Sequence, residues 1–352
     1  MSSELINAVK LIAIQKNIDE DTIMEALKLS LIAACRKNFG LAQNIDVNID
    51  KDSGAVQVIA YKKVVEKVDD SRLEILLEDA KNIDARYKLE DMAEIIITPK
   101  NFGRIAAQTA KQVISQKFLE IERNNLFNKF DVKKGKIITG IVRGFEYRNI
   151  IINLGDIETI LPEKEQIPGE IFNVNDRIKL YVIDVKRFSK GISIFVSRTN
   201  PNFIRCLFEL EIPEISSGIV KIVDIARDPG KRSKVAVTSQ NDEVEAIGSC
   251  VGENSCRINT ISSEINNEKI DLVNWHENLE DYIRSALSPA KIKEIHLNKN
   301  KTEALIIVDE NQVSLVIGKG GQNVKLAAKL VGIRLNVKTP AQLEGEELLN
   351  NI

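Results

Sequence analysis

The sequence has few of the side chains that enzymes most often use for chemistry. It contains two histidines, His276 and His296, and four cysteines that show no Cys-x-x-Cys spacing. We therefore expect no zinc site and no disulfide framework, and the four thiols are expected to be reduced, small apolar side chains. A Walker loop, a Gly-x-Ser-x-Gly motif and a cluster of metal ligands are also missing. These absences argue against an enzyme, and no cofactor or metal is expected.

Long apolar runs are absent as well. No stretch approaches the roughly 18 uninterrupted apolar residues of a membrane span, and the opening residues MSSELINAVK lack the pattern of a signal peptide. A cytoplasmic protein without a membrane partner is expected. The chain has 352 residues, of which 43% are hydrophobic and 28% charged, which is enough for two to four globular domains.

Charge is unevenly distributed along the chain. Basic and acidic side chains number 19 and 21 in residues 1–131, 12 and 8 in 132–200, 8 and 14 in 201–280, and 10 and 8 in 281–352. A protein that gripped nucleic acid along its whole length by neutralising phosphates would be uniformly basic. This distribution instead indicates local and modest nucleic-acid binding.

The first third of the chain reads as an α/β module. A helical stripe runs from Ile23 to Ala34, alternating runs at 45–49, 55–66 and 94–98 predict strands, and the turn at 51–54 predicts a hairpin. A long helix is expected from Arg104 to about Phe127, where it would connect this module to the next.

Five short β-rich runs between Lys134 and Arg198 predict a closed barrel of the OB type. They lie at 137–142, 150–154, 158–161, 178–184 and 192–196. Arg143, Tyr147 and Arg148 cluster at the first hairpin, where two cations and one ring could clamp a single nucleic-acid strand. The alternative is a barrel that serves as a spacer with solvated charges at its hairpin tip. Phe145 is expected to pack inside the barrel.

The most informative stretch is VIGKGGQNVKLAAKLVG, residues 316–332. It places the loop Gly318-Lys319-Gly320-Gly321 between two helical patterns. Glycines let a sugar-phosphate strand approach, the next helix offers unpaired N–H groups, and Lys319 adds positive charge. Lys325 and Lys329 are four residues apart and share one helix face. A KH-type RNA-binding loop is predicted, and a plain helix–helix connector is the alternative.

The same order of elements occurs 66 residues earlier, where Gly252 corresponds to Gly318. Two tandem copies of one fold are therefore expected. The earlier loop reads Gly252-Glu253-Asn254-Ser255, with Ser255 in place of a glycine and a carboxylate that would face phosphate. Arg257 is a candidate phosphate contact that would partly offset Glu253. We expect the second copy to carry more RNA affinity than the first.

Five longer strings extend this interpretation. They are FGRIAAQTAKQVISQK (102–117), SRTNPNFIRCLFELEIPEI (197–215), IARDPGKRSKVAV (225–237), EKIDLVNW (268–275) and LVIGKGGQNVKLAAKL (315–330). Through them the chain resembles, over essentially its whole length, the NusA family of bacterial transcription elongation factors.

The resemblance implies a multidomain α+β protein. Its implied domains are an RNA-polymerase-binding N-terminal domain (1–131), an S1-type OB barrel (132–200), a first KH domain (201–280), a second KH domain (281–345) and a short tail (346–352).

It also implies binding to RNA polymerase core and to nascent single-stranded RNA, together with other antitermination factors, by a monomer that modulates pausing, termination and antitermination. Candidate polymerase contacts are Phe102, Arg104, Gln108 and Lys111. Some family members carry acidic C-terminal repeats that mask RNA binding, and an RNA surface without that masking is expected here. The alternative function is a translation- or ribosome-associated RNA-binding protein, or an RNA chaperone, built from the same modules.

Overall fold

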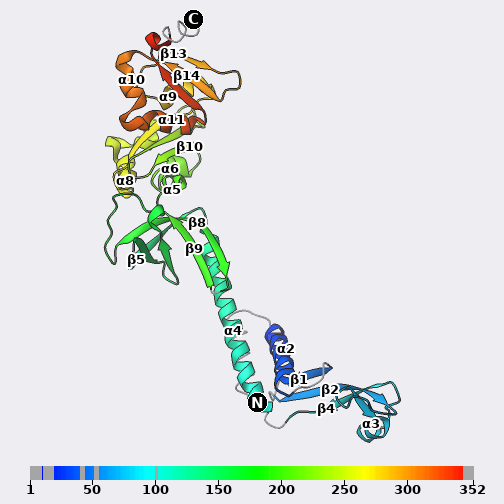
Figure 1. The fold of residues 1–352 in the computed structure, drawn as a ribbon. Helices are drawn as coiled ribbons and strands as arrows, with labels where there is room; N and C mark the ends of the chain where they lie inside the picture. Colours follow the sequence, from blue (N-terminus) through cyan, green and yellow to red (C-terminus); the bar gives the residue numbers. More distant parts are fainter. Residues whose placement is uncertain are drawn as a thin grey trace. The chain divides into compact units, whose positions relative to one another are not determined.

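The computed structural model describes residues 10, 20–39, 44–50, 55–99, 102–189 and 191–343. The predicted hairpin turn at 51–54 and the tail at 346–352 lie outside these residues. Internal contacts divide the chain into two compact units, Met1–Leu126 and Phe127–Ile352. Each unit is described separately below (Figure 1).

The first unit packs helices against a small sheet. Its elements are α2 (Glu20–Phe39), β1 (Ile45–Ile49), β2 (Val56–Val65), β3 (Glu74–Leu76), α3 (Leu77–Ile83), β4 (Met92–Ile96) and the start of α4 (Phe102–Asp131). Strand β2 pairs antiparallel with β1 and β4 and parallel with β3. Buried side chains from α2 and α4, such as Leu27, Leu31 and Ala106, pack with Val47 and Val58 of the sheet. The predicted α/β module is present, and β3 and α3 are additions that the sequence patterns did not predict.

The second unit begins with a five-stranded antiparallel sheet. Its strands are β5 (Ile137–Glu146), β6 (Asn149–Asn153), β7 (Glu158–Leu161), β8 (Arg177–Phe188) and β9 (Gly191–Ser197), with the short η1 (Glu163–Glu165) after β7. They pair in the order β7-β6-β5-β8-β9. The hydroxyl of Thr159 in β7 donates to the carbonyl of Ile194 in β9 at 2.6 Å, so the two edges of the sheet meet. This nearly closed sheet is consistent with the predicted OB-type barrel.

Two copies of one three-stranded fold follow the barrel. The first, after α5 (Pro201–Glu211) and α6 (Pro213–Ser216), contains β10 (Val220–Asp228), β11 (Arg232–Ser239), α7 (Ala246–Val251), η2 (Glu253–Ser255), α8 (Cys256–Glu264) and β12 (Lys269–Asn274). The second, after α9 (Leu279–Ala286), contains β13 (Glu294–Leu297), β14 (Glu303–Ile307), α10 (Glu310–Ile317), η3 (Lys319–Gly321), α11 (Gln322–Val331) and β15 (Arg334–Lys338). In both, the first two strands are antiparallel and the last two parallel. The predicted tandem repeat is therefore confirmed.

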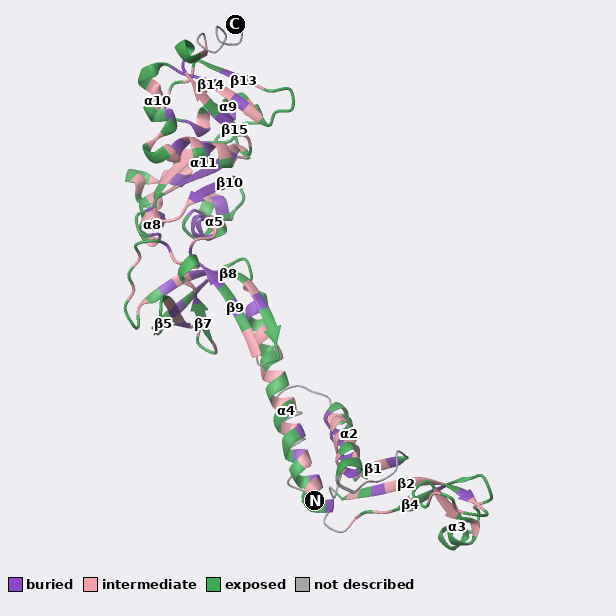
Figure 2. Ribbon diagram, in the orientation of Figure 1, coloured by how far each residue is buried: buried purple, intermediate pink, exposed green. Residues whose placement is uncertain are grey.

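The two copies share an apolar layer. Ala226, Ala236 and Val273 from the first sheet belong to the same buried cluster as Ile283 of α9 and Leu330 of the second copy. Figure 2 shows this burial in β10 and α11. Burying apolar surface stabilises the contact, so α11 and the loop before it are held next to the first copy.

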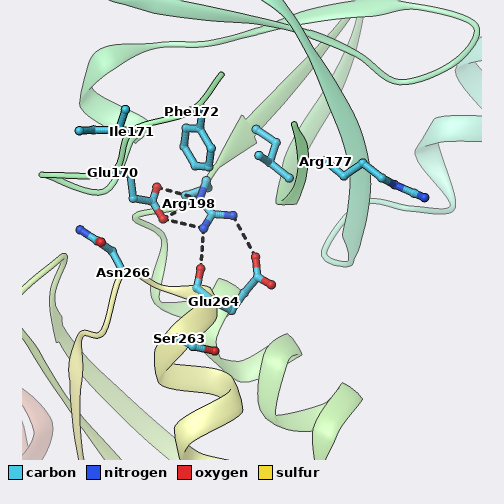
Figure 3. A pocket seen from close by; sticks show the side chains of 9 residues that line it. Glu170, Ile171, Phe172, Arg177, Arg198, Ser263, Glu264 and Asn266 are labelled. Atoms are coloured by element: carbon cyan, nitrogen blue, oxygen red, sulfur yellow. Dashed lines mark hydrogen bonds and ion pairs between the residues drawn. The ribbon is translucent and has the colours of Figure 1, made fainter. Parts of the chain in front are cut away.

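A buried arginine joins the barrel to the first copy (Figure 3). The Arg198 side chain is 2% exposed and donates to Glu170 of the barrel at 2.6 Å and to the backbone carbonyl of Glu264 in α8 at 2.6 Å. Its Nη1 lies 3.4 Å from a carboxylate oxygen of Glu264. Every donor of a buried guanidinium needs a partner, and these partners come from both domains. Arg198 therefore fixes one against the other.

Candidate nucleic-acid interface

The second-copy loop adopts a left-handed backbone conformation that favours glycine. Gly318 ends α10 with φ 72° and ψ 174°, and a Cβ there would lie 2.8 Å from the Cβ of Asn323. Gly320 has φ 63°, but a Cβ on it would meet nothing within 4 Å. Gly318 is thus required for close packing, whereas Gly320 lies beside open space that a ligand could enter.

Helix α11 begins directly at this loop. Its N-cap is Gly321, which provides no side-chain cap, so the first N–H groups of the helix have no side-chain partner at that position. The exposed Lys319 precedes the helix start, and Lys325 and Lys329 lie exposed on the helix itself. A Cβ on Gly321 would lie 3.5 Å from the Cε of Lys325, so this lysine lies against the loop. Helix dipole and lysines together favour a bound anion.

The lysines line a groove that includes residues of the first copy. The groove encloses about 720 Å³ and is lined by Lys319, Gly320, Gln322, Lys325, Leu326 and Lys329 together with Arg227, Asp228 and Lys231. The amide of Gln322 donates to the carboxylate of Asp228 at 2.9 Å, which brings the β10–β11 turn to the start of α11. The groove therefore belongs to both copies.

Lys231 is the residue that sequence reasoning missed. Its side chain is 68% exposed, and its Nζ lies 3.4 Å from Asp228, the one carboxylate among the residues that line the groove. Arg227 is 5% exposed and paired with Glu268, so its charge is already compensated. Lys231 thus adds a fourth exposed cation to the three predicted lysines. The Pro229-Gly230 pair marks a turn in the sequence, but no local pattern showed that this turn reaches the second copy.

The first-copy loop repeats the same backbone path with different side chains. Gly252 has φ 73° and ψ 174°, Asn254 has φ 50° and ψ 31°, and Ser255 has φ 60° and ψ 23°. Gly318, Gly320 and Gly321 have nearly the same angles. Left-handed backbone costs a non-glycine residue roughly 1–2 kcal/mol, so Ser255 is accommodated at a cost.

The hollow at the first-copy loop is lined by two carboxylates and one arginine, whereas four lysines line the groove at the second-copy loop. The hollow is lined by Glu214, Gly248, Ser249, Gly252, Glu253, Cys256 and Arg257. Nη1 of Arg257 donates to Glu214 at 2.8 Å and to the carbonyl of Ser249 at 2.6 Å. The cation expected to offset Glu253 is therefore bound to protein groups, and no lysine lines this hollow.

The predicted barrel residues lie together at the β5–β6 hairpin. Tyr147 is 98% exposed with φ 54°. Arg143 and Arg148 are 69% and 80% exposed and lie 4.0 Å from Glu158 and 2.9 Å from Glu163. Such exposed pairs are weak, so both guanidinium groups are available to a ligand. Phe145 was wrongly expected inside the barrel: it is 51% exposed because it lies at the end of β5, next to the hairpin turn, although its partner Ile150 is buried.

The candidate polymerase contacts separate into one core residue and three surface residues. Phe102 is 1% exposed and packs in the core of the first unit, which excludes it from a docking surface. Arg104, Gln108 and Lys111 are exposed. Their spacing of four and three residues puts them on one face of α4.

Buried thiols are kept protonated. Burial raises the pKa of Cys35 and of Cys206 to about 11 and the pKa of Cys250 to about 12, because the thiolate would lose its hydration. The described part of the chain contains no group of three or more His, Cys, Asp or Glu side chains placed to hold a metal ion. Among the same residues, no helix has the length and apolar content needed to cross a membrane.

Comparison with known proteins assigns these modules. The family model for the NusA N-terminal domain matches residues 4–124, that for the NusA-like first KH domain matches 198–275, and that for the NusA-like second KH domain matches 279–344. The transcription termination/antitermination protein NusA of Halalkalibacterium halodurans is 43% identical over 100% of this chain and 92% of its own length. The chain belongs to the NusA family. NusA proteins of Bacillus subtilis and Thermus thermophilus are 43% and 39% identical over 96% and 94% of this chain and 91% and 89% of their own lengths.

Membership of the NusA family identifies the two repeated copies as KH domains. The loops at Gly252 and Gly318 are therefore the helix–loop–helix turns of two successive KH folds. Together with the N-terminal match and the nearly closed barrel, this confirms the predicted order of modules.

Proposed function

We propose that the protein is a transcription elongation factor that acts in termination and antitermination by binding both nascent single-stranded RNA and RNA polymerase core. The observation that carries the RNA part is the groove at Gly318–Gly321, where four exposed lysines from two KH domains surround a glycine loop and a helix start. Phosphate backbones bind such sites through charge and backbone N–H groups. The names of the relatives support the assignment to transcription.

Each domain has a separate role in this proposal. Residues 1–131 dock on polymerase, and the barrel at 132–200 and the KH domains at 201–280 and 281–345 bind RNA. The exposed face of Arg104, Gln108 and Lys111 on α4 is the polymerase contact we propose, and Phe102 supports it from the core. The protein acts as a cytoplasmic monomer with other antitermination factors, and binding requires no catalytic group.

RNA binding is tested with Gly320→Asp in the full chain. The substitution adds a carboxylate at a position where a Cβ would meet no atom within 4 Å, and Asp tolerates left-handed backbone, so the fold is expected to persist. Repulsion of phosphate should weaken binding of a single-stranded RNA about tenfold or more. Gly218→Asp is the matched control, because Gly218 has φ +79° and equally open space outside both KH loops. Equal affinities of the two variants would contradict the assigned site.

The polymerase part is tested with the same full chain. Tagged protein is mixed with purified RNA polymerase core or with purified ribosomes, and the captured partner is measured. Capture of polymerase, weakened by Arg104→Glu with Lys111→Glu, is expected. Capture of ribosomes alone, with RNA binding intact, would assign the protein to translation or RNA chaperoning instead.

A further inference from the structure

One side chain lies beneath the first glycine of each KH loop. In the second copy this is Asn323, which is 4% exposed. Its Nδ2 donates to the carbonyls of Leu315 at 3.0 Å and Val316 at 3.2 Å, in the last turn of α10. Its Cβ would be 2.8 Å from a Cβ on Gly318. The side chain thus ties the start of α11 to the end of α10 across the loop.

Arg257 makes the corresponding contacts in the first copy. It precedes Asn323 by 66 residues, and its acceptor Ser249 precedes Leu315 by the same number. Nη1 donates to the Ser249 carbonyl at 2.6 Å, and a Cβ on Gly252 would lie 2.8 Å from the Cγ of Arg257. Two different side chains therefore make the same connection at equivalent positions.

The first copy adds an anchor outside the repeat. Glu214 of α6 accepts from Nη1 of Arg257 at 2.8 Å, and the two side chains are 29% and 27% exposed. An RNA phosphate would have to compete with this carboxylate and with the Ser249 carbonyl for Nη1.

The backbone of the first loop is less favourable for its residues than that of the second loop, so a side chain that ties the two flanking helices together matters more there. Asn254 and Ser255 hold left-handed angles that glycines hold in the second loop. Serine, unlike glycine and asparagine, has no special tolerance of these angles and keeps them only where surrounding contacts impose them. The contacts of Arg257 with the end of α7 and with α6 supply this constraint.

We propose that Arg257 and Asn323 are equivalent positioning residues, which hold their loops in the RNA-competent conformation, and that Arg257 acts through the loop rather than as a phosphate contact. The inference deepens the proposed RNA function. Its first test is made without RNA, so that it can fail or succeed independently of RNA binding.

The test compares Arg257→Ala with Arg257→Gln in the full chain. Backbone NMR resonances of Asn254 and Ser255 report the loop conformation in the free protein. Gln keeps an uncharged amide donor, like that of Asn323 at the equivalent position, whereas Ala keeps no donor. We expect Ala to displace both resonances and Gln to leave them close to those of the unsubstituted protein. Lys269→Gln removes one exposed charge from the same domain and serves as the control.

RNA titrations over a range of salt concentrations then separate the two roles. The slope of log K against log salt is negative. Removing a cation that neutralises one phosphate of single-stranded RNA reduces the magnitude of this slope by about 0.7. Unchanged loop resonances in Arg257→Ala, with that decrease in slope in both Arg257 variants, would make Arg257 a phosphate contact and overturn the proposal.

The second copy offers an independent test if Arg257→Ala does not fold. Asn323→Leu keeps the volume beneath Gly318 and removes both donated hydrogen bonds. Displaced resonances of Gly320 and Gly321, with RNA affinity lowered about tenfold, are expected. Resonances that stay in place would refute the positioning role.

Discussion

Arg227 and Glu268 form an ion pair in which both side chains are almost completely buried. Their Nη2 and Oε2 atoms lie 2.9 Å apart, with 1% and 0% of the side chains exposed. Glu268 also accepts from the N–H of Gly230 at 2.9 Å and from the Ser233 hydroxyl. Nη1 of Arg227 donates to the backbone carbonyl of Arg198 at 2.7 Å, where the barrel ends. The pair thus fixes the β10–β11 turn that supplies Lys231 to the groove.

Arg227→Met is expected to lower the free energy of unfolding by about 3–5 kcal/mol, because it leaves the Glu268 carboxylate buried without its cation. Chemical denaturation of the second unit measures the effect. Arg232→Met is the control, since the Arg232–Asp271 pair has a similar distance of 2.8 Å but side chains 32% and 25% exposed. Arg232→Met should lower the free energy of unfolding much less than Arg227→Met does. An equal decrease in both variants would show that burial of the ion pair does not determine its contribution.

Ser255→Gly is expected to stabilise the protein by up to about 1 kcal/mol, because glycine holds φ 60° without a Cβ penalty. The same exchange at Ser263, which lies within α8, should destabilise by about 0.5–1 kcal/mol. Thermal unfolding of both variants measures the difference in sign. Destabilisation of similar size at both positions would show that Ser255 makes a contact that outweighs its strain.

The strands of the barrel and the helices around the second loop could be predicted from sequence because their apolar patterns are local. The helical pattern expected before the second loop is helix α10, which ends at Ile317. Strand β3 has three residues and pairs with β2 in parallel, which no local pattern reveals. Helix α3 buries only Ala80, so it has no apolar stripe to detect.

The candidate site was predictable only where one segment supplies it. Gly318 to Lys329 form a contiguous stretch, whereas Lys231 joins the groove through packing of two domains. The positioning role that we propose for Arg257 could not be predicted from the sequence for a related reason. Its charge suggested a phosphate contact, but its long side chain lies beneath Gly252 and binds Glu214 from an earlier helix.

Lys231→Gln should weaken binding of single-stranded RNA. It should also reduce the magnitude of the slope of log K against log salt by about 0.7, as expected when one phosphate is no longer neutralised. The physical reason is its place in the groove beside the second KH loop. Affinity is measured by titration at several salt concentrations. Lys269→Gln removes an equal charge from the first KH domain outside that groove, and an identical loss of affinity there would show that only net charge matters.

Cys256 is expected to be the thiol that reacts first with a maleimide in the folded protein. It is exposed, whereas Cys35, Cys206 and Cys250 are buried. Their pKa values of about 11, 11 and 12 leave almost no thiolate at pH 8. Labelling followed by mass spectrometry should find one fast site before unfolding and four after it. Fast labelling of Cys250 would show that α7 opens readily.

The carboxylate in the first KH loop should limit that domain's contribution to RNA binding. Glu253→Lys introduces the charge that Lys319 supplies in the second loop, on a backbone with nearly the same angles. RNA affinity should rise several-fold. The slope of log K against log salt should become steeper by about 0.7 for each phosphate newly neutralised. Glu243→Lys, an equal charge change at an exposed residue that does not line the hollow, is the control. In the unsubstituted loop, Asn254→Asp, at the position equivalent to Gly320, should weaken binding less than Gly320→Asp does. Equal losses of affinity from these two variants would mean that Glu253 does not keep RNA from the first loop.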